Sequence, residues 1–419
     1  MPHQSAASDR DPRFARFAWI MIDWAASAFS TVLITLVVAY VEKVVLPDGA
    51  WGMEAGVIWA WTLAAAMLAS AALAPWAAAW ADRHDAHQRA LVAGTLVGIG
   101  GLIALAAMPT AARLGVVAAV VVANVGFDIA QVFTGSLLQR IAGRHGTDRL
   151  SAQGFAAGYA GGAIALVTAT SIVTARDRLG LDVATALKLA FVATAAWWLV
   201  FSLPAAFARF GSGDGSRHAA NPGRELFDFA SSLFGSTSAA DRRFSAVLVG
   251  SMLALGGIQT AIAQFTSLAL QRFDLDGPAL VRLVLLVQAV ALPGALGVGW
   301  LATRFGRRPA TAICLGGWIL VLVLAWFVQT PTDLHWLAVL LALVLGGAQS
   351  LLRAAVAALT PSGHAGVAFG LLQVGTKLAG FAAGLVFGAI LLATGVPQAG
   401  LIALIAQLVA AWWMLWRAV

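Results

Sequence analysis

Apolar stretches long enough to cross a membrane recur along the whole 419-residue chain, and they constrain its fold more than any other feature. A helix of about 20 apolar residues crosses a hydrocarbon core of roughly 30 Å. The alternating polarity of a membrane β-strand is absent, so the spans must be helices, in which each backbone group is paired. Twelve spans are predicted, at residues 17–41, 56–80, 90–108, 115–140, 151–175, 185–208, 243–271, 278–303, 309–329, 335–359, 364–392 and 397–417.

Charged residues are too few to cover a soluble protein of this size. They make up 11% of the chain, and hydrophobic residues make up 60%, whereas about 25% of a soluble domain is charged. Residues 1–16 are polar and are predicted to form a cytoplasmic tail rather than a signal peptide. Tryptophans near the span ends, Trp19 among them, are typical of the interfacial belt of a membrane protein.

The basic residues indicate how the chain is oriented. The net charge is +7; with the N-terminus inside, 17 Lys and Arg residues fall on the cytoplasmic side and 7 on the other. This asymmetry follows the positive-inside rule and predicts that both termini are cytoplasmic. The excess of basic residues therefore reports the membrane topology. We expect the protein to contact the lipid bilayer and no nucleic acid.

A polar segment divides the chain into two halves. Residues 209–241 are predicted to link a six-helix bundle at 17–208 to a second one at 242–419. Within the linker, residues 224–234 suit either a short amphipathic helix on the inner membrane surface or a simple tether. Glycines recur every fourth residue in one span of each half, which predicts close helix packing there. These glycines are Gly154, Gly158 and Gly162, and Gly380, Gly384 and Gly388.

Two loops carry a family signature. Residues 299–308 read Gly-Trp-Leu-Ala-Thr-Arg-Phe-Gly-Arg-Arg. They resemble the Gly-x-x-x-Asp-Arg-x-Gly-Arg-Arg loop of the major facilitator superfamily, with Thr303 at the acidic position. The loop after the second span keeps only the acid and the first arginine. In that superfamily the loop holds neighbouring helices together on the inner face, which implies this role for Asp82, Arg83, Gly299, Arg304, Gly306, Arg307 and Arg308.

The first span narrows the resemblance. Residues 23–29, Asp-Trp-Ala-Ala-Ser-Ala-Phe, look like the Asp-Trp-Ala-Asn-Ser-Ala-Phe motif of the vacuole-effluxer-like branch, with Ala26 in place of Asn. Residues 154–162, 346–353 and 369–377 resemble its fifth, tenth and eleventh helices. The resemblance implies a major facilitator fold with 12 transmembrane helices in two bundles. It also implies a secondary transporter in a bacterial inner membrane, exporting amino acids or related zwitterions.

Four ionisable residues stand out inside predicted spans, away from the span ends, where each costs at least about 2.5–3.5 kcal/mol. Asp23 and Arg353 each lie roughly 9 Å from the cytoplasmic end of their spans, and we expect them to pair as a cytoplasmic gate. Asp128 and Lys377 lie near the midplane. There they suit the two charges of a zwitterion or a proton relay, with Asp128 as the proton-carrying group. The alternative is that each charge pairs locally and only fixes packing.

Other polar residues share helix faces with these charges. The resemblance implies that the first, fourth, seventh and tenth helices line a central cavity, so we expect some of them to join a midplane site. The predicted midplane site comprises Asp128, Lys377, Asn124, Gln131, Gln264 and Gln373; Tyr159 is a weaker candidate.

Several functions find no support in the sequence. A phosphate-binding Gly-x-x-x-x-Gly-Lys-Ser/Thr motif, a metal-ligand spacing of the seven histidines and a nucleophile–base pair are all missing. We therefore predict a monomeric secondary transporter coupled to H+ or another ion, with no enzymatic activity, cofactor or metal. The competing hypothesis is a membrane sensor or chaperone that retains the transporter fold without transporting; an enzyme embedded in the membrane is a more distant one.

Overall fold

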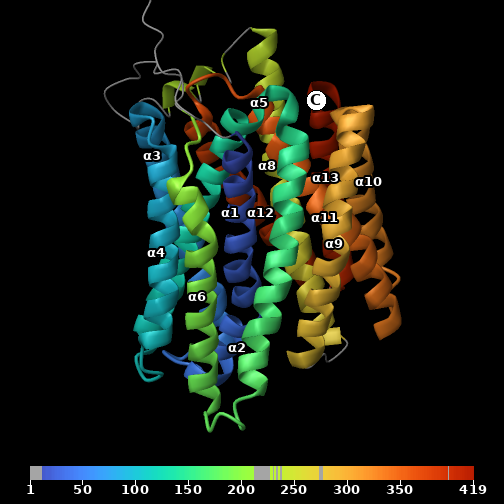
Figure 1. Ribbon diagram of the computed structural model, residues 1–419. Coiled ribbons are helices and arrows are strands. Elements are labelled where there is room, and N and C mark those ends of the chain that lie inside the picture. Colours follow the sequence, from blue (N-terminus) through green and yellow to red (C-terminus); the bar gives the residue numbers. More distant parts are fainter. Residues whose placement is uncertain are drawn as a thin grey trace, which may run out of the picture.

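The computed structural model describes residues 12–211, 227–229, 231, 232, 235, 238–272, 277–394 and 396–419. Nearly all of these residues are helical, and the long helices run side by side (Figure 1). Twelve helical segments in the described part are long and apolar enough to cross a membrane. The predicted all-α fold with twelve spans is confirmed.

The first bundle contains six spans. Its first span begins with α1 and continues through two short π-helical segments. The helices are α1 (Pro12–Val32), η1 (Leu33–Val37), α2 (Val38–Tyr40), η2 (Val41–Val45), α3 (Ala55–His84), α4 (His87–Ala107), α5 (Arg113–Thr174) and α6 (Val183–Phe207). α5 contains both the fourth and the fifth span, which meet at Gly143. The predicted spans 115–140 and 151–175 are each extended, to Arg113–Gly143 and Gly146–Thr174. The chain is helical on both sides of Gly143, whose φ of 65° a glycine adopts at little cost.

The second bundle contains the other six spans. Its helices are α8 (Ala239–Arg272), α9 (Gly277–Phe305), α10 (Arg307–Ala325), α11 (Pro331–Leu359), α12 (Ala365–Thr394) and α13 (Pro397–Ala418). Only Gly306, with a φ of 91°, separates α9 from α10. A capping box of Thr330 and Asp333 begins α11, because each side chain accepts a hydrogen bond from a backbone N–H that the first turn leaves free.

The bundle boundaries differ slightly from the predicted ones. Residues 12–16, predicted to belong to the tail, are already helical, and α8 begins three residues before 242; residues 1–11 lie outside the described part. Within the predicted amphipathic segment 224–234, the described residues 227–229, 231 and 232 are helical. Phe229 is buried there and stacks on His364, with ring centroids 4.8 Å apart. This part of the linker therefore packs against the second bundle.

Both described chain ends lie at one end of the molecule, at the top of Figure 1. We call this end the termini face and the other end the opposite face. Towards the termini face, α5 packs against α9 and α11, and α3 packs against α12. Glycines allow these close contacts: a Cβ at Gly135 would overlap the Phe369 ring, and one at Gly346 would overlap the Tyr159 ring.

The two predicted glycine faces behave differently. Gly154, Gly158 and Gly162 lie against α1, where an added Cβ would collide with Asp23, Ser27 or Thr31. In the second stripe Gly380 packs against Gly256, but a Cβ at Gly384 or Gly388 would meet open space. Close packing therefore explains the first stripe and only the beginning of the second.

Candidate functional site

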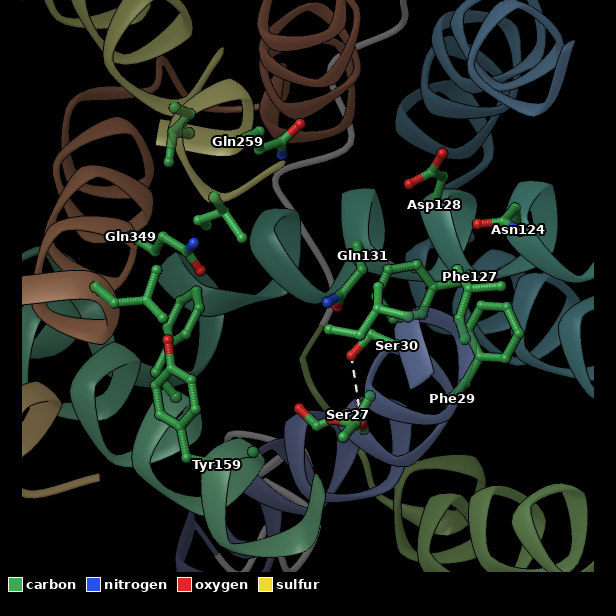
Figure 2. Close-up of a pocket in the computed structure, with 18 of the residues that line it drawn as sticks. Ser27, Phe29, Ser30, Asn124, Phe127, Asp128, Gln131, Tyr159, Gln259 and Gln349 are labelled. Atoms are coloured by element: carbon green, nitrogen blue, oxygen red, sulfur yellow. Dashed lines mark hydrogen bonds between the residues drawn. The ribbon is translucent and has the colours of Figure 1, made fainter. Parts of the chain in front are cut away.

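A cavity of about 600 Å³ lies between the two bundles, a volume typical of small-molecule sites. Helices of both bundles line it, and the lining mixes aromatic and aliphatic side chains with polar ones (Figure 2). The polar lining residues are Ser27, Ser30, Thr31, Asn124, Asp128, Gln131, Tyr159, Gln259, Gln288, Gln349, Arg353, Gln373 and Lys377.

An ion pair connects the bundles at the cavity wall. Lys377 of α12 places its Nζ 3.0 Å from Oδ2 and 3.2 Å from Oδ1 of Asp128 on α5. Gln373, one turn before Lys377 on the same helix face, donates from Nε2 to Asp128 Oδ1 at 2.9 Å. Asp128 is buried, so its charge needs these partners. The three residues predicted for the midplane thus form one cluster.

A second ion pair lies between the cavity and the termini face. Arg353 of α11 donates to both carboxylate oxygens of Asp23 on α1, at 2.7 and 3.1 Å. Its Nε also donates to Ser151 Oγ at 3.0 Å, and its Nη2 donates to Ser151 O at 3.2 Å. The guanidinium lies between the Trp19 and Phe155 rings, 4.8 and 4.3 Å from their centroids. The predicted Asp23–Arg353 pair is therefore present. Ser151, Trp19 and Phe155 surround it.

Two features of this site could not be read from the sequence. Trp19 is fully buried, and its Nε1 donates to Thr134 O at 2.9 Å, so its assignment to an interfacial belt is wrong. Gly154 faces the ion pair: a Cβ there would lie 2.8 Å from Trp19 Cζ3 and 3.0 Å from Arg353 Nη2, and closer still to Asp23 Oδ2. With a larger residue at this position, the ion pair or the Trp19 ring would have to shift.

Asp82 links the end of α3 to the beginning of α12. Its two carboxylate oxygens accept hydrogen bonds from the backbone N–H groups of Gly366 and Val367, at 2.8 and 2.7 Å. Such N–H groups lack partners within the helix, and the positive end of the helix dipole favours an acid there. His87 supports the contact, with Nε2 3.0 Å from Asp82 and Nδ1 2.9 Å from Ser136 Oγ.

A corresponding contact lies in the other half. There a base follows the second helix and an acid lies at the start of the other bundle's fifth helix. Arg307, at the start of α10, donates from Nε to both oxygens of Asp148, at 2.8 and 3.0 Å, and from Nη2 to Thr147 Oγ1 at 2.8 Å. Asp148 lies in the first turn of the fifth span. In each half, therefore, the loop after the second helix holds the start of the other bundle's fifth helix. Within the described part of the chain, Thr303, at the acidic position, bonds only to Trp300 O.

The remaining signature residues have other roles. Gly299 packs so closely on Ala152 of the first bundle that a Cβ would overlap it. Arg304 lies over the Phe305 ring and Arg308 over the Trp416 ring, at 5.4 and 4.3 Å from the centroids. Arg83 is exposed at the end of α3.

The predicted midplane set is placed in part. Asn124, Gln131 and Gln373 line the cavity, whereas the Gln264 side chain lies outside the described residues. Sequence reasoning missed Gln259, which lines the cavity from α8, and Gln288, which donates from α9 to Thr31 Oγ1 at 3.4 Å. Each is an isolated amide in an apolar run, and that rarity is the signal that could have found both.

Comparisons with known proteins agree with this architecture. The family model described as "Vacuole effluxer Atg22 like" matches residues 53–418. The uncharacterized MFS-type transporter YxiO of Bacillus subtilis (strain 168) is 26% identical over 368 residues, covering 86% of this chain and 85% of YxiO.

Solved structures share the fold at low sequence identity. The human organic anion transporter MFSD10 (TETRAN) is 13% identical, with a TM-score of 0.71 over 97% of this chain and 100% of its own. The E. coli fucose:proton symporter FucP is also 13% identical. Its TM-score is 0.74, and the match covers 97% of this chain and 98% of FucP. Together with the twelve spans and the cavity between two bundles, these matches show that the chain belongs to the Vacuole effluxer Atg22-like family and is a transporter of the major facilitator type.

Proposed function

We propose that this transporter moves a small polar solute by alternating access and couples that movement to protons. The observation that carries the proposal is the Asp128–Lys377 pair, which joins the two bundles at 3.0 Å in the wall of the cavity. A group that binds a proton here changes both the contact between bundles and the charge that a solute meets.

Three contacts between bundles favour closure on the termini face in this conformer. They are the Asp23–Arg353 pair, the Asp82 contact with the start of α12 and the Arg307–Asp148 pair. The positive-inside rule assigns the termini face to the cytoplasm. We therefore assign this conformer to the outward-facing state, and a structure of FucP in the outward conformation has the same fold, with a TM-score of 0.73. Transport then requires these contacts to break while the bundles rock about the cavity.

Protonation of Asp128 supplies the coupling. Ionised, the carboxylate holds Lys377 and Gln373 across the bundle boundary; protonated, it loses the Coulomb attraction to the lysine. Removing one partner of a buried ion pair costs about 3–5 kcal/mol. A difference of that size is enough to change which of two conformers dominates. The fucose:proton symporter is proton-coupled by its name, which supports the same ion here.

The family supports a direction of transport and a class of solute. Membership among vacuole-effluxer-like proteins favours export, with amino acids or related zwitterions as cargo.

Flux across liposomes tests the proposal. Purified protein is reconstituted and given a pH gradient together with a mixture of radiolabelled amino acids. Wild type accumulates label, and Asp128→Asn and Lys377→Ala lose gradient-driven accumulation. Lys188→Ala is the control, because Lys188 bonds to Met108 O away from the cavity. Unimpaired accumulation by both cavity variants would rule out the midplane mechanism.

A further inference from the structure

Five uncharged polar side chains in the cavity make no hydrogen bond to any other described residue. They are the amides of Gln131, Gln259 and Gln349 and the hydroxyls of Ser27 and Tyr159. The Oε1 atom of Gln131 is buried without a partner, which is uncommon in folded proteins and calls for an explanation. These groups are free to bind a solute.

The charged side chains at the cavity, by contrast, already have partners. Lys377 pairs with Asp128, and Arg353 pairs with Asp23, so the formal charges of the four sum to zero. A solute with a net charge would leave bulk water for a site that offers it no unpaired counter-charge. That transfer is strongly unfavourable.

The free groups surround one space and come from both bundles. Figure 2 shows Gln131 and Ser27 on one side of an open space, facing Gln349 and Tyr159 on the other. Gln131 and Ser27 belong to α5 and α1, and Gln349 belongs to α11 of the second bundle. A solute that bridges Gln131 and Gln349 would therefore bind differently when the bundles move, as a transported solute must.

Amides and hydroxyls each offer both a donor and an acceptor. Solutes that carry amide or hydroxyl groups can satisfy them, whereas a purely apolar solute would leave them unpaired, a loss that gives strong discrimination. Accepting that the cavity is the transport site of the proposed function, we infer that the solute has no net charge and is recognised by hydrogen bonds to Gln131, Gln259 and Gln349. The Asp128–Lys377 pair then serves the proton.

Thermal unfolding of the purified protein tests this with probes matched in size and different in charge. L-glutamine is compared with L-glutamate and L-lysine, and xylitol with D-xylonate. A bound probe raises the unfolding temperature. The inference predicts that glutamine, xylitol or both stabilise the protein and that their charged counterparts do not. Glutamine alone would identify a zwitterion as the net-neutral solute, and xylitol alone would identify a polyol.

Variants locate the binding. Gln131→Leu and Gln349→Leu each should weaken binding of the active neutral probe about two- to tenfold, the loss of one net hydrogen bond. Gln407→Leu is the matched control, because its amide donates to Leu253 O within the second bundle, and it should bind normally. Equal or tighter binding of a charged counterpart, no binding of either neutral probe, or normal binding by both cavity variants would overturn the inference.

The same assay separates this inference from the proposed function. The wild-type protein should bind the neutral probe, and Asp128→Asn should lose gradient-driven flux. If the wild-type protein binds the probe and Asp128→Asn transports normally, the coupling proposal fails and the recognition inference stands. If neither neutral probe binds but the flux result holds, the inference fails and the coupling proposal stands.

Discussion

Replacing Gly154 with alanine should open the termini face of this transporter. The glycine lies opposite the Asp23–Arg353 pair, and the added Cβ would come within 2.8 Å of the Trp19 ring and 3.0 Å of Arg353 Nη2. Neither neighbour can easily retreat. Trp19 is fully buried, and the guanidinium is fixed by Asp23, Ser151 and two aromatic rings. Trp19 lies in the same bundle as Gly154, so the part of the strain that is relieved when the bundles separate on this side is the contact with Arg353 of α11.

The size of the effect follows from the cost of overpacking. An extra methyl in a well-packed site costs about 1–3 kcal/mol, and each 1.4 kcal/mol changes an equilibrium about tenfold. If the Arg353 contact accounts for a cost of that size, Gly154→Ala should raise the population of the open state relative to this conformer about fivefold to 100-fold. Gly384→Ala is the control, because a Cβ at Gly384 would meet nothing within 4 Å.

Labelling of a cysteine in the cavity measures this shift. Cys314 is the only cysteine and is buried, so Cys314→Ser provides a background into which Gln259→Cys is introduced. A membrane-impermeant maleimide is applied from each side of oriented vesicles. Labelling from the termini side should accelerate in the Gly154→Ala background and stay slow in the Gly384→Ala background. Equal rates in the two backgrounds would refute the idea that this glycine permits closure.

Three further predictions follow from other contacts. Arg353→Met should destabilise the protein by about 3–5 kcal/mol, because Asp23 is left buried and unpaired. Asp23→Leu combined with it should restore much of the loss in thermal unfolding; no recovery would contradict the pairing argument. Asp82→Asn removes a charge from the start of α12 and should weaken closure by about 1 kcal/mol, seen as faster labelling from the termini side. Hydrogen bonds from Thr185 hold the pKa of the exposed Asp182 carboxyl below its ordinary value. Its stabilising effect is thus present above the ordinary aspartate pKa and is lost as the pH falls through the lowered one. Asp182→Asn should remove this part of the acid dependence of the unfolding temperature, and an unchanged acid profile would contradict it.

The sequence predicts the spans and the buried charges because both depend on rules that act residue by residue. Hydrocarbon accepts long apolar helices, and it makes a residue such as Asp128 costly wherever it lies. Counting residues from the span ends was enough to place Asp23 at about the depth of Arg353 and Asp128 at about the depth of Lys377, since rise per residue is fixed in a helix. The structure brings both pairs together.

Other features depend on how the helices rotate and pack, which spacing alone does not give. The predicted spans leave Asp148 outside both the fourth and the fifth helix, whereas the structure places it in the first turn of the fifth span, where it meets Arg307. Trp19 resembles an interfacial residue by position, yet the rotation of α1 buries its ring under Arg353. Gln259 has no charge and no motif, so only the assembled cavity distinguishes it from a packing residue.

We propose that protonation of Asp128 controls the rocking of the two bundles. Spin labels at Arg89→Cys on α4 and Thr303→Cys on α9, in the Cys314→Ser background, report their separation on the termini face by pulsed electron resonance; both positions are exposed. In the wild-type protein, the account predicts that acidification increases the population with a longer distance. In Asp128→Asn, that population should be high at every pH and should not respond to acid. An Asp128→Asn protein whose distances respond to acid as the wild type does would contradict the account.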